Sequence, residues 1–116
     1  MDYDLSSLEE LFGKDSDDFK DILKAFVFDY NQRFPLLEKA IKERNFEQIA
    51  KQSHAFKSVV GNFNLFDLME LAKKIELFGK NRILQDEEST LDALFIKFSE
   101  GLKDFKQYIE NRYDLK

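Results

Sequence analysis

The chain has 116 residues, a formal net charge of −5 and no cysteine. Its length fits one domain, residues 1–116, and its 43% hydrophobic and 35% charged residues indicate a folded core rather than a disordered tail. Without cysteine there are no disulfides, thiolate metal sites or cysteine nucleophiles, and the negative charge argues against nucleic acid as a partner.

The composition also bears on location and fold class. No apolar run approaches the roughly 18 residues that span a bilayer, and the N-terminus lacks the order of charges in a signal peptide. We therefore expect no membrane segment and a cytoplasmic location. Four glycines, one proline and no alternating β-branched runs favour an all-α fold. Met1 followed by a complete set of helices favours a free protein over a module of a longer kinase.

The first two predicted helices span residues 5–12 and 16–44. Ser6 or Ser7 can cap the first helix, and Gly13 can end it. Asp15, Ser16 and Asp17 put capping oxygens and negative charge where the second helix begins, and apolar residues then keep to one face over some six turns. Pro35 predicts a kink in this long helix, since the periodicity resumes in phase beyond it; the alternative is two helices divided at Phe34.

The third predicted helix, residues 46–63, carries the only histidine of the chain, His54. Asn45 can cap it. Its buried seam alternates spacings of three and four, with small Ser53 among apolar Phe46, Ile49, Phe56, Val60 and Phe63.

A second line on this helix holds His54, Lys57, Ser58 and Gly61, because a helix turns about 100° per residue. That line lies more than a quarter-turn from the centre of the seam. We therefore expect the imidazole to face water.

The last two helices are predicted at residues 65–79, with Gly79 near the end, and at residues 90–113, capped by Ser89 with Asp92. The segment 79–90 reads as a loop. Four amphipathic helices with short connections predict an up-down four-helix bundle preceded by a short N-terminal helix.

The segment from Ser53 to Asn64, with the sequence SHAFKSVVGNFN, resembles the central motif of histidine-containing phosphotransfer (HPt) domains. That motif usually reads small residue, His, any, apolar, Lys, Gly, three small residues, polar, apolar, Gly. The resemblance extends over essentially the whole chain. HPt domains of this type have a short leading helix and then a four-helix bundle, in which the third helix carries the phosphorylated histidine. The helices predicted above have the same order. A proline within the second helix is also common in the family.

The resemblance implies that His54 accepts a phosphoryl group from an aspartyl phosphate and passes it to a response-regulator aspartate. Lys57 would then neutralise charge on the phosphoryl oxygens, and Glu76 would orient the ring through Nδ1. Lys80 lies on the same polar line as Glu76, although the two residues can also form an ordinary i,i+4 ion pair. Gly61, on the same line of the third helix as His54, is the remaining residue predicted to lie near the imidazole.

Two positions depart from the family pattern. Ser58 stands where the family usually has a glycine beside the histidine, and Asn64 replaces the closing glycine, an exchange that left-handed geometry permits. Neither change removes the chemistry, but the Ser58 side chain could slow transfer or narrow the choice of partner.

The implied role is that of a phosphorelay carrier in two-component signalling, a monomer without enzymatic activity of its own. Its partners would be receiver domains of response regulators or hybrid histidine kinases; the receiver supplies the magnesium, so the chain needs no cofactor. Phe12, Phe28 and Phe66 fall off the core stripes and could dock a receiver, or simply pack at the periphery. The alternative function is a non-catalytic helical interaction or scaffold module of HPt shape.

Overall fold

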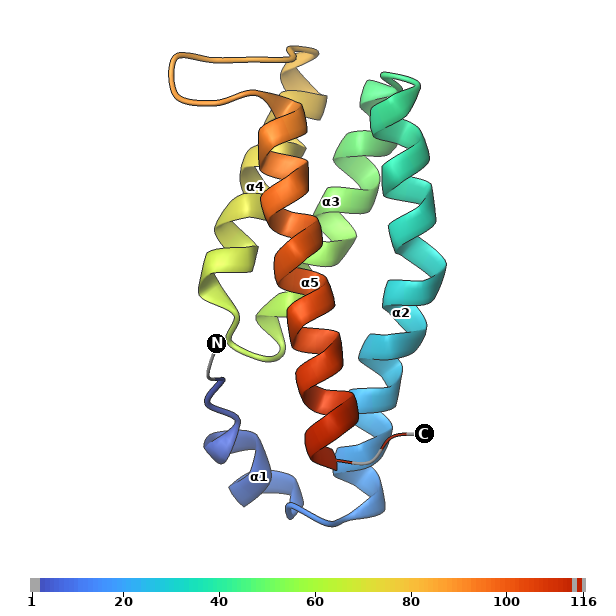
Figure 1. Ribbon diagram of the computed structural model, residues 1–116, viewed down its shortest axis with the longest axis vertical. Coiled ribbons are helices and arrows are strands. Elements are labelled where there is room, and N and C mark those ends of the chain that lie inside the picture. Colours follow the sequence, from blue (N-terminus) through green and yellow to red (C-terminus); the bar gives the residue numbers. More distant parts are fainter. Residues whose placement is uncertain (1–2, 114, 116) are drawn as a thin grey trace.

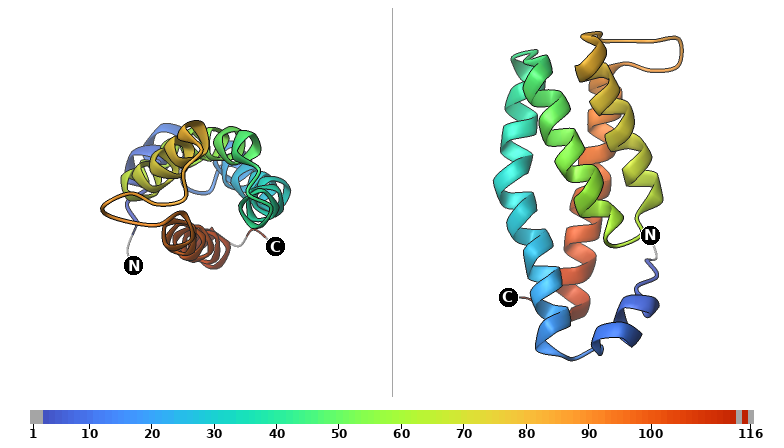
Figure 2. Two further views of the ribbon diagram at one scale, coloured as in Figure 1. Left: turned by 90° about the horizontal axis from the view of Figure 1, so that it is seen from above. Right: turned by 180° about the vertical axis from the view of Figure 1, so that it is seen from behind.

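In the computed structural model, which describes residues 3–113 and 115, four long helices run side by side and a short fifth lies across one end (Figure 1). This confirms the predicted all-α fold, an up-down four-helix bundle with a short leading helix. Seen from above, α3 lies between α2 and α4, and α5 closes the bundle (Figure 2). The helices are α1 (Ser6–Phe12), α2 (Asp17–Lys42), α3 (Phe46–Gly61), α4 (Phe66–Asn81) and α5 (Leu91–Tyr113).

The short helix α1 begins differently from the prediction that Ser6 or Ser7 caps it. Leu5 is the N-cap residue and supplies no side-chain cap, while the carboxylate of Asp4 accepts a hydrogen bond from the Ser6 amide at 3.0 Å. An aspartate oxygen can satisfy a helix-start amide as well as a serine hydroxyl can. Gly13 ends α1 with φ of 87°, as predicted for a residue that tolerates this conformation.

The long helix α2 starts where the sequence indicated. The Ser16 hydroxyl accepts a hydrogen bond from the Phe19 amide at 3.1 Å, which satisfies one of the free amides of the first turn. The helix continues through Pro35 to Lys42, so the alternative of two helices divided at Phe34 is wrong. Burial on one face both before and after the proline holds the two halves in a single helix.

Very short turns join α3 to its neighbours. The Asn45 side chain caps α3 by accepting from the Gln48 amide at 3.2 Å, as predicted. Asn64 adopts the left-handed conformation, with φ of 58°, in the turn to α4. These turns make α2, α3 and α4 antiparallel neighbours.

Gly79 lies near the end of α4, as predicted, and it also determines how closely α4 approaches α3. It is buried within α4, which continues to Asn81. A Cβ atom at Gly79 would lie 2.7 Å from the Ala50 nitrogen and 2.9 Å from the Phe46 oxygen of α3. The missing side chain therefore allows the backbones of α3 and α4 to touch at this level.

At the start of α5, the residue that caps the helix differs from the predicted one. Thr90, not Ser89, supplies the cap: its hydroxyl accepts from the Ala93 amide at 3.1 Å. Asp92 instead pairs with Arg44 at 3.1 Å, which ties the start of α5 to the turn between α2 and α3.

Aromatic side chains dominate the core of the bundle. Phe26 meets Phe63 and Phe105 edge to face, and Phe56 meets Phe98 in the same way. Each fully buried phenylalanine contributes about 1.5–3 kcal/mol of transfer free energy. None of the described helices combines the length and the apolar character that a membrane span requires.

Candidate functional site

His54 lies in the middle of α3 with its side chain on the outside of the bundle. Its side chain is 64% exposed, whereas the preceding Ser53 and nearby Phe56 are completely buried. The predicted exposure of the imidazole is therefore confirmed. The buried seam fixes how α3 is rotated, and that rotation turns His54 outward.

Glu76 of α4 holds the imidazole from one side. Its carboxylate oxygen Oε2 lies 2.8 Å from Nδ1 of His54, and its side chain is only 4% exposed. A carboxylate can only accept a hydrogen bond, so Nδ1 carries the proton in this contact. In the neutral ring, Nε2 then keeps a free lone pair.

Two lysines complete the charge distribution around this carboxylate. Lys57 Nζ lies 3.0 Å from Glu76 Oε1, and Lys80 Nζ lies 3.3 Å from Oε2. Lys57 is the less exposed of the two. With one carboxylate and two ammonium groups, the cluster carries a net positive charge whether the imidazole is neutral or protonated. This excess allows the cluster as a whole to attract an anion, although Glu76 alone would repel one.

The titration of Glu76 follows from these contacts. Burial acts to raise its pKa, but the hydrogen bonds from Lys57, His54 and Lys80 outweigh burial and lower the pKa below its ordinary value of 4.5. Glu76 is therefore ionised at neutral pH. An ionised carboxylate keeps the proton of His54 on Nδ1.

The other two predicted neighbours of His54 lie along α3. Ser58, one turn after His54, is exposed, so its hydroxymethyl group occupies surface that a glycine would leave open. Gly61 is the last residue of α3, and a Cβ there would lie 3.3 Å from Met69 Cε. Met69 thus packs against the end of the histidine helix.

The structure does not bring the three predicted docking phenylalanines together around His54. Phe12 is partly buried and packs against the core, so peripheral packing accounts for it. Phe28 is 64% exposed, but it is two residues from buried Phe26 and hence points away from the bundle. Phe66, 66% exposed, begins α4 and lines a groove apart from His54.

One exposed apolar residue, next to Glu76 in the sequence, was not among the predicted site residues. Leu77 follows Glu76 directly, is 45% exposed, and lies one turn before Lys80 on the outer face of α4. The periodicity of the sequence could have identified Leu77 as exposed, because it lies off the stripe of buried residues that includes Ala72 and Ile75.

The arrangement suits nucleophilic attack by a single exposed nitrogen more than metal chemistry. Among the residues that the structure describes, no group of three or more histidine or acidic side chains could hold a metal ion. The site offers an oriented imidazole, a buried anion behind it and two cations paired with that anion.

Comparisons with known proteins agree with this geometry. The sequence model of the family described as Hpt domain matches residues 21–111, which include His54 and all three of its charged neighbours. Searches of curated proteins and of solved structures gave no match. Because the family model covers well over half of the chain, the chain belongs to the Hpt domain family.

Proposed function

We propose that His54 is the phosphoacceptor of a phosphorelay. As an Hpt domain, the chain is a phosphocarrier of two-component signalling rather than a catalyst. The specific proposal is that His54 receives its phosphoryl group from an aspartyl phosphate of a receiver domain and passes it to a response-regulator aspartate. The observation that carries it is the hydrogen bond of 2.8 Å from Nδ1 to Glu76, which leaves Nε2 of an exposed ring free to attack.

In the proposed step, the lone pair of Nε2 attacks the phosphorus of the acyl phosphate. A P–N bond forms, the P–O bond to the receiver aspartate breaks, and the aspartate leaves as a carboxylate. The ring of His54 becomes positively charged, since it keeps its proton on Nδ1. Glu76 stabilises that charge through the same hydrogen bond, so no proton needs to move during transfer.

Lys57 and Lys80 supply positive charge next to the transferred group. In the unphosphorylated chain both ammonium groups pair with Glu76. Their flexible stems allow them to turn towards phosphoryl oxygens once these arrive. Because Lys57 is half-buried, its side chain loses less conformational entropy than that of exposed Lys80 when it becomes fixed against a phosphoryl oxygen.

We further propose that receiver domains dock on the surface around His54 formed by Ser58, Leu77 and Lys80. Leu77 offers an exposed apolar side chain on the outer face of α4, and Lys80 a positive charge paired with the carboxylate that holds the histidine. The partners would be receivers of response regulators or of hybrid histidine kinases. We propose that residues 1–116 act as a single, monomeric, cytoplasmic Hpt domain that needs no cofactor.

The test is transfer of radiolabelled phosphate from phosphorylated receiver domains of the same cell. Label should appear on this chain, be acid-labile and alkali-stable, and be absent in His54→Gln with unchanged helical content. His54 is exposed, so this substitution should not disturb folding. If no receiver of the cell transfers label to the wild-type chain, the chain is a non-catalytic interaction module instead.

A further inference from the structure

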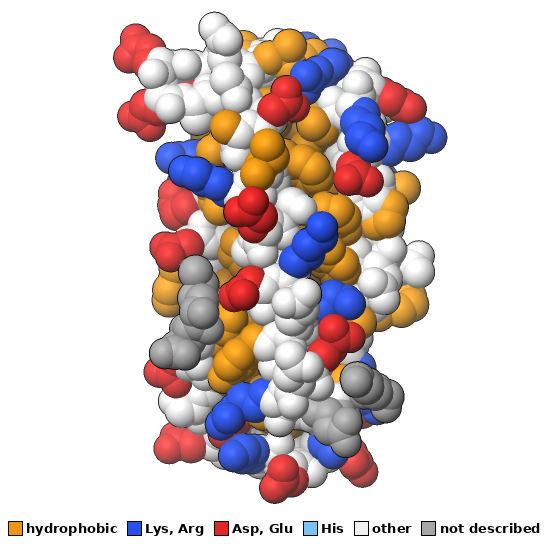
Figure 3. Space-filling view, in the orientation of Figure 1, with side chains coloured by type: hydrophobic (Ala, Val, Ile, Leu, Met, Phe, Trp, Pro, Cys, Tyr) orange, Lys and Arg blue, Asp and Glu red, His pale blue; other side chains and the backbone are white. Residues whose placement is uncertain are grey.

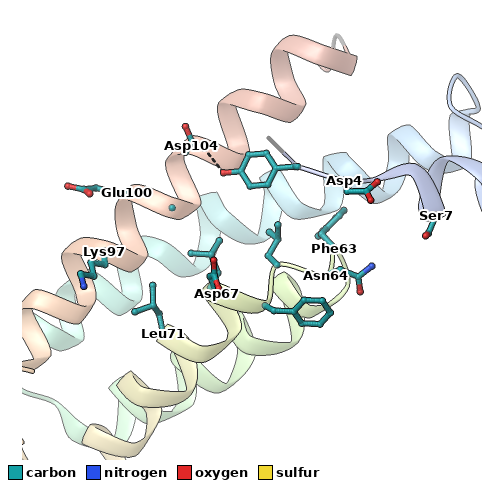
Figure 4. Close-up of a pocket in the computed structure, with 14 residues that line it drawn as sticks. Asp4, Ser7, Phe63, Asn64, Asp67, Leu71, Lys97, Glu100 and Asp104 are labelled. Atoms are coloured by element: carbon teal, nitrogen blue, oxygen red, sulfur yellow. Dashed lines mark hydrogen bonds between the residues drawn. The ribbon is translucent and has the colours of Figure 1, made fainter. Parts of the chain in front are cut away.

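A groove apart from His54 runs between α4 and α5, closed at one end by the segment that precedes α1. It has a volume of about 910 Å³ and shares no lining residue with the histidine site. Figure 4 shows Leu71 and Asp67 on the α4 side, Lys97, Glu100 and Asp104 along α5, and Phe63 and Asn64 at the connection from α3. Fourteen residues line it, most of them from these elements.

The floor of the groove is apolar. Leu68 and Phe63 are buried beneath it, and Leu71 is partly buried at its side. Gly101 contributes no side chain. A Cβ atom at Gly101 would lie 2.4 Å from Cδ2 of Leu68, so the Leu68 side chain fills that space. Figure 3, in the orientation of Figure 1, shows orange hydrophobic side chains exposed among charged ones on the face of the molecule that includes α5.

Phe66 stands at the rim of this floor. Its ring is 66% exposed at the first position of α4. A large aromatic side chain exposed beside an apolar floor is typical of a surface that a partner covers.

The rim is strongly acidic. Four carboxylates line the groove, those of Asp4, Asp67, Glu100 and Asp104, against the single ammonium of Lys97. None of the four forms an ion pair with a lysine or arginine of the described residues. The Asp104 carboxylate accepts a hydrogen bond from the Tyr3 hydroxyl, and the Asp4 carboxylate accepts one from the Ser6 hydroxyl, so both side chains are held in place.

The spacing of the rim charges fits a helical ligand. Lys97, Glu100 and Asp104 lie three and four residues apart on one face of α5, so they repeat once per helical turn. The groove has helices on its two long sides, and a third helix can lie along them with apolar residues inward. The net charge of −5 makes a second copy of this chain a poor occupant.

We propose that this groove binds a basic amphipathic helix of a partner protein, with apolar residues on the floor and lysines or arginines against the acidic rim. The binding site differs from the receiver surface, because the groove and the His54 cluster have no residue in common. The partner can therefore remain bound while His54 exchanges a phosphoryl group. It contacts the turn of residues 63–66, which joins the helix of His54 to the helix of Glu76.

The test uses a synthetic labelled peptide of about 18 residues, which spans about 27 Å as a helix. Its apolar face carries leucines and its polar face lysines, and a control peptide carries glutamate in place of each lysine. Fluorescence anisotropy with the wild-type chain should give saturable binding of the lysine peptide, with a Kd in the micromolar range, about 1–100 µM. The glutamate peptide should not bind.

Matched variants separate the groove from general charge attraction. Phe66→Ala should weaken binding by about fivefold or more, while Phe28→Ala, which removes an equally exposed ring elsewhere, should change it by less than about twofold. The double variant Asp67→Asn/Glu100→Gln should weaken binding about tenfold. Its control is Asp18→Asn/Asp21→Asn on α2, which makes the same change in net charge and likewise alters a first-turn aspartate.

Three outcomes overturn the proposal. The first is no saturable binding up to about millimolar peptide, an affinity too weak for a specific site. The second is an equal loss in the groove variants and their controls, which shows diffuse attraction to an acidic protein. The third is self-association of the wild-type chain in sedimentation that Phe66→Ala abolishes, because a second copy then occupies the groove.

Discussion

The carboxylate of Glu76 lies 2.8 Å from Nδ1 of His54 and 3.0 Å from Nζ of Lys57, so one buried anion holds both the nucleophile and its nearest cation. The three residues come from two helices whose backbones touch where Gly79 meets Ala50. The geometry of the site therefore depends on how closely α3 and α4 pack as well as on the side chains themselves.

Glu76→Gln tests the role of the negative charge behind the ring. The amide can still accept a hydrogen bond from Nδ1, but it cannot stabilise the charged ring that forms on phosphorylation. We expect the rate of phosphoryl acceptance from a receiver to fall by about tenfold or more. Rapid-quench measurement of labelled chain gives the rate, with Glu70→Gln, an exposed glutamate on the same helix, as the control. Equal rates for Glu76→Gln and wild type would remove Glu76 from the mechanism.

The lowered pKa of Glu76 also predicts how stability depends on pH. A carboxyl whose pKa is lower in the folded chain adds stability above its unfolded pKa, which is near 4.5, and loses that contribution as pH falls through the folded value. The difference in unfolding free energy between wild type and Glu76→Gln should thus be largest above about pH 5 and shrink in more acidic solution. Urea denaturation at a series of pH values measures it. A difference that stays constant with pH contradicts the assignment.

The two lysines should contribute unequally. Lys57 is the more buried partner of Glu76, and charges in less solvated positions interact more strongly. We expect Lys57→Gln to slow transfer by about tenfold and Lys80→Gln by about two- to threefold. Transfer rates from one receiver at low and high salt provide the measurement, with exposed Lys73→Gln as the control. An effect of Lys73→Gln as large as that of Lys57→Gln would point to general attraction between the proteins.

Sequence periodicity predicted the outward position of His54 because burial of Ile49, Phe56 and Val60 fixes the rotation of α3. It also placed Glu76 on a polar line of its helix, whereas the structure buries this side chain. Spacing within one helix cannot say which residues of two helices meet. That pairing depends on how closely the helices approach. Gly79 determines the approach, and the sequence suggested only a helix end there.

The other differences between the predicted and the observed structure also have local causes. The sequence offered several oxygens near each helix start, and only backbone geometry selects Thr90 over Ser89 or Asp4 over Ser6. The α4–α5 groove could not be predicted from spacing within any one helix, because its lining residues come from three separate segments of the chain.

Ser58 should limit the rate or the choice of receivers. Its side chain is exposed one turn from His54, where an approaching receiver must come close. Ser58→Gly should speed transfer by about two- to threefold while costing about 0.5 kcal/mol of helix stability. Ser58→Leu should slow transfer by about tenfold without unfolding the chain, since an exposed position tolerates the larger side chain. Rates across a panel of receivers and thermal denaturation separate the two effects, and unchanged rates in Ser58→Leu would show that receivers do not approach this position.

Gly79→Ala tests whether the contact between α3 and α4 sets the site. The new Cβ would lie 2.7 Å from a backbone nitrogen, and the backbone of α3 cannot give way cheaply. The overlap should cost about 1–3 kcal/mol beyond the roughly 1 kcal/mol that alanine gains in helix propensity. It should also separate Glu76 from His54 and so slow phosphoryl acceptance.

Gly61→Ala is the matched control on the neighbouring helix. There the Cβ would lie 3.3 Å from the flexible end of Met69, which can turn aside, so stability should stay the same or rise slightly. Urea denaturation and rapid-quench transfer assays on both variants make the comparison. If Gly79→Ala keeps wild-type stability and rate, the close approach of the two helices does not determine how Glu76 meets His54.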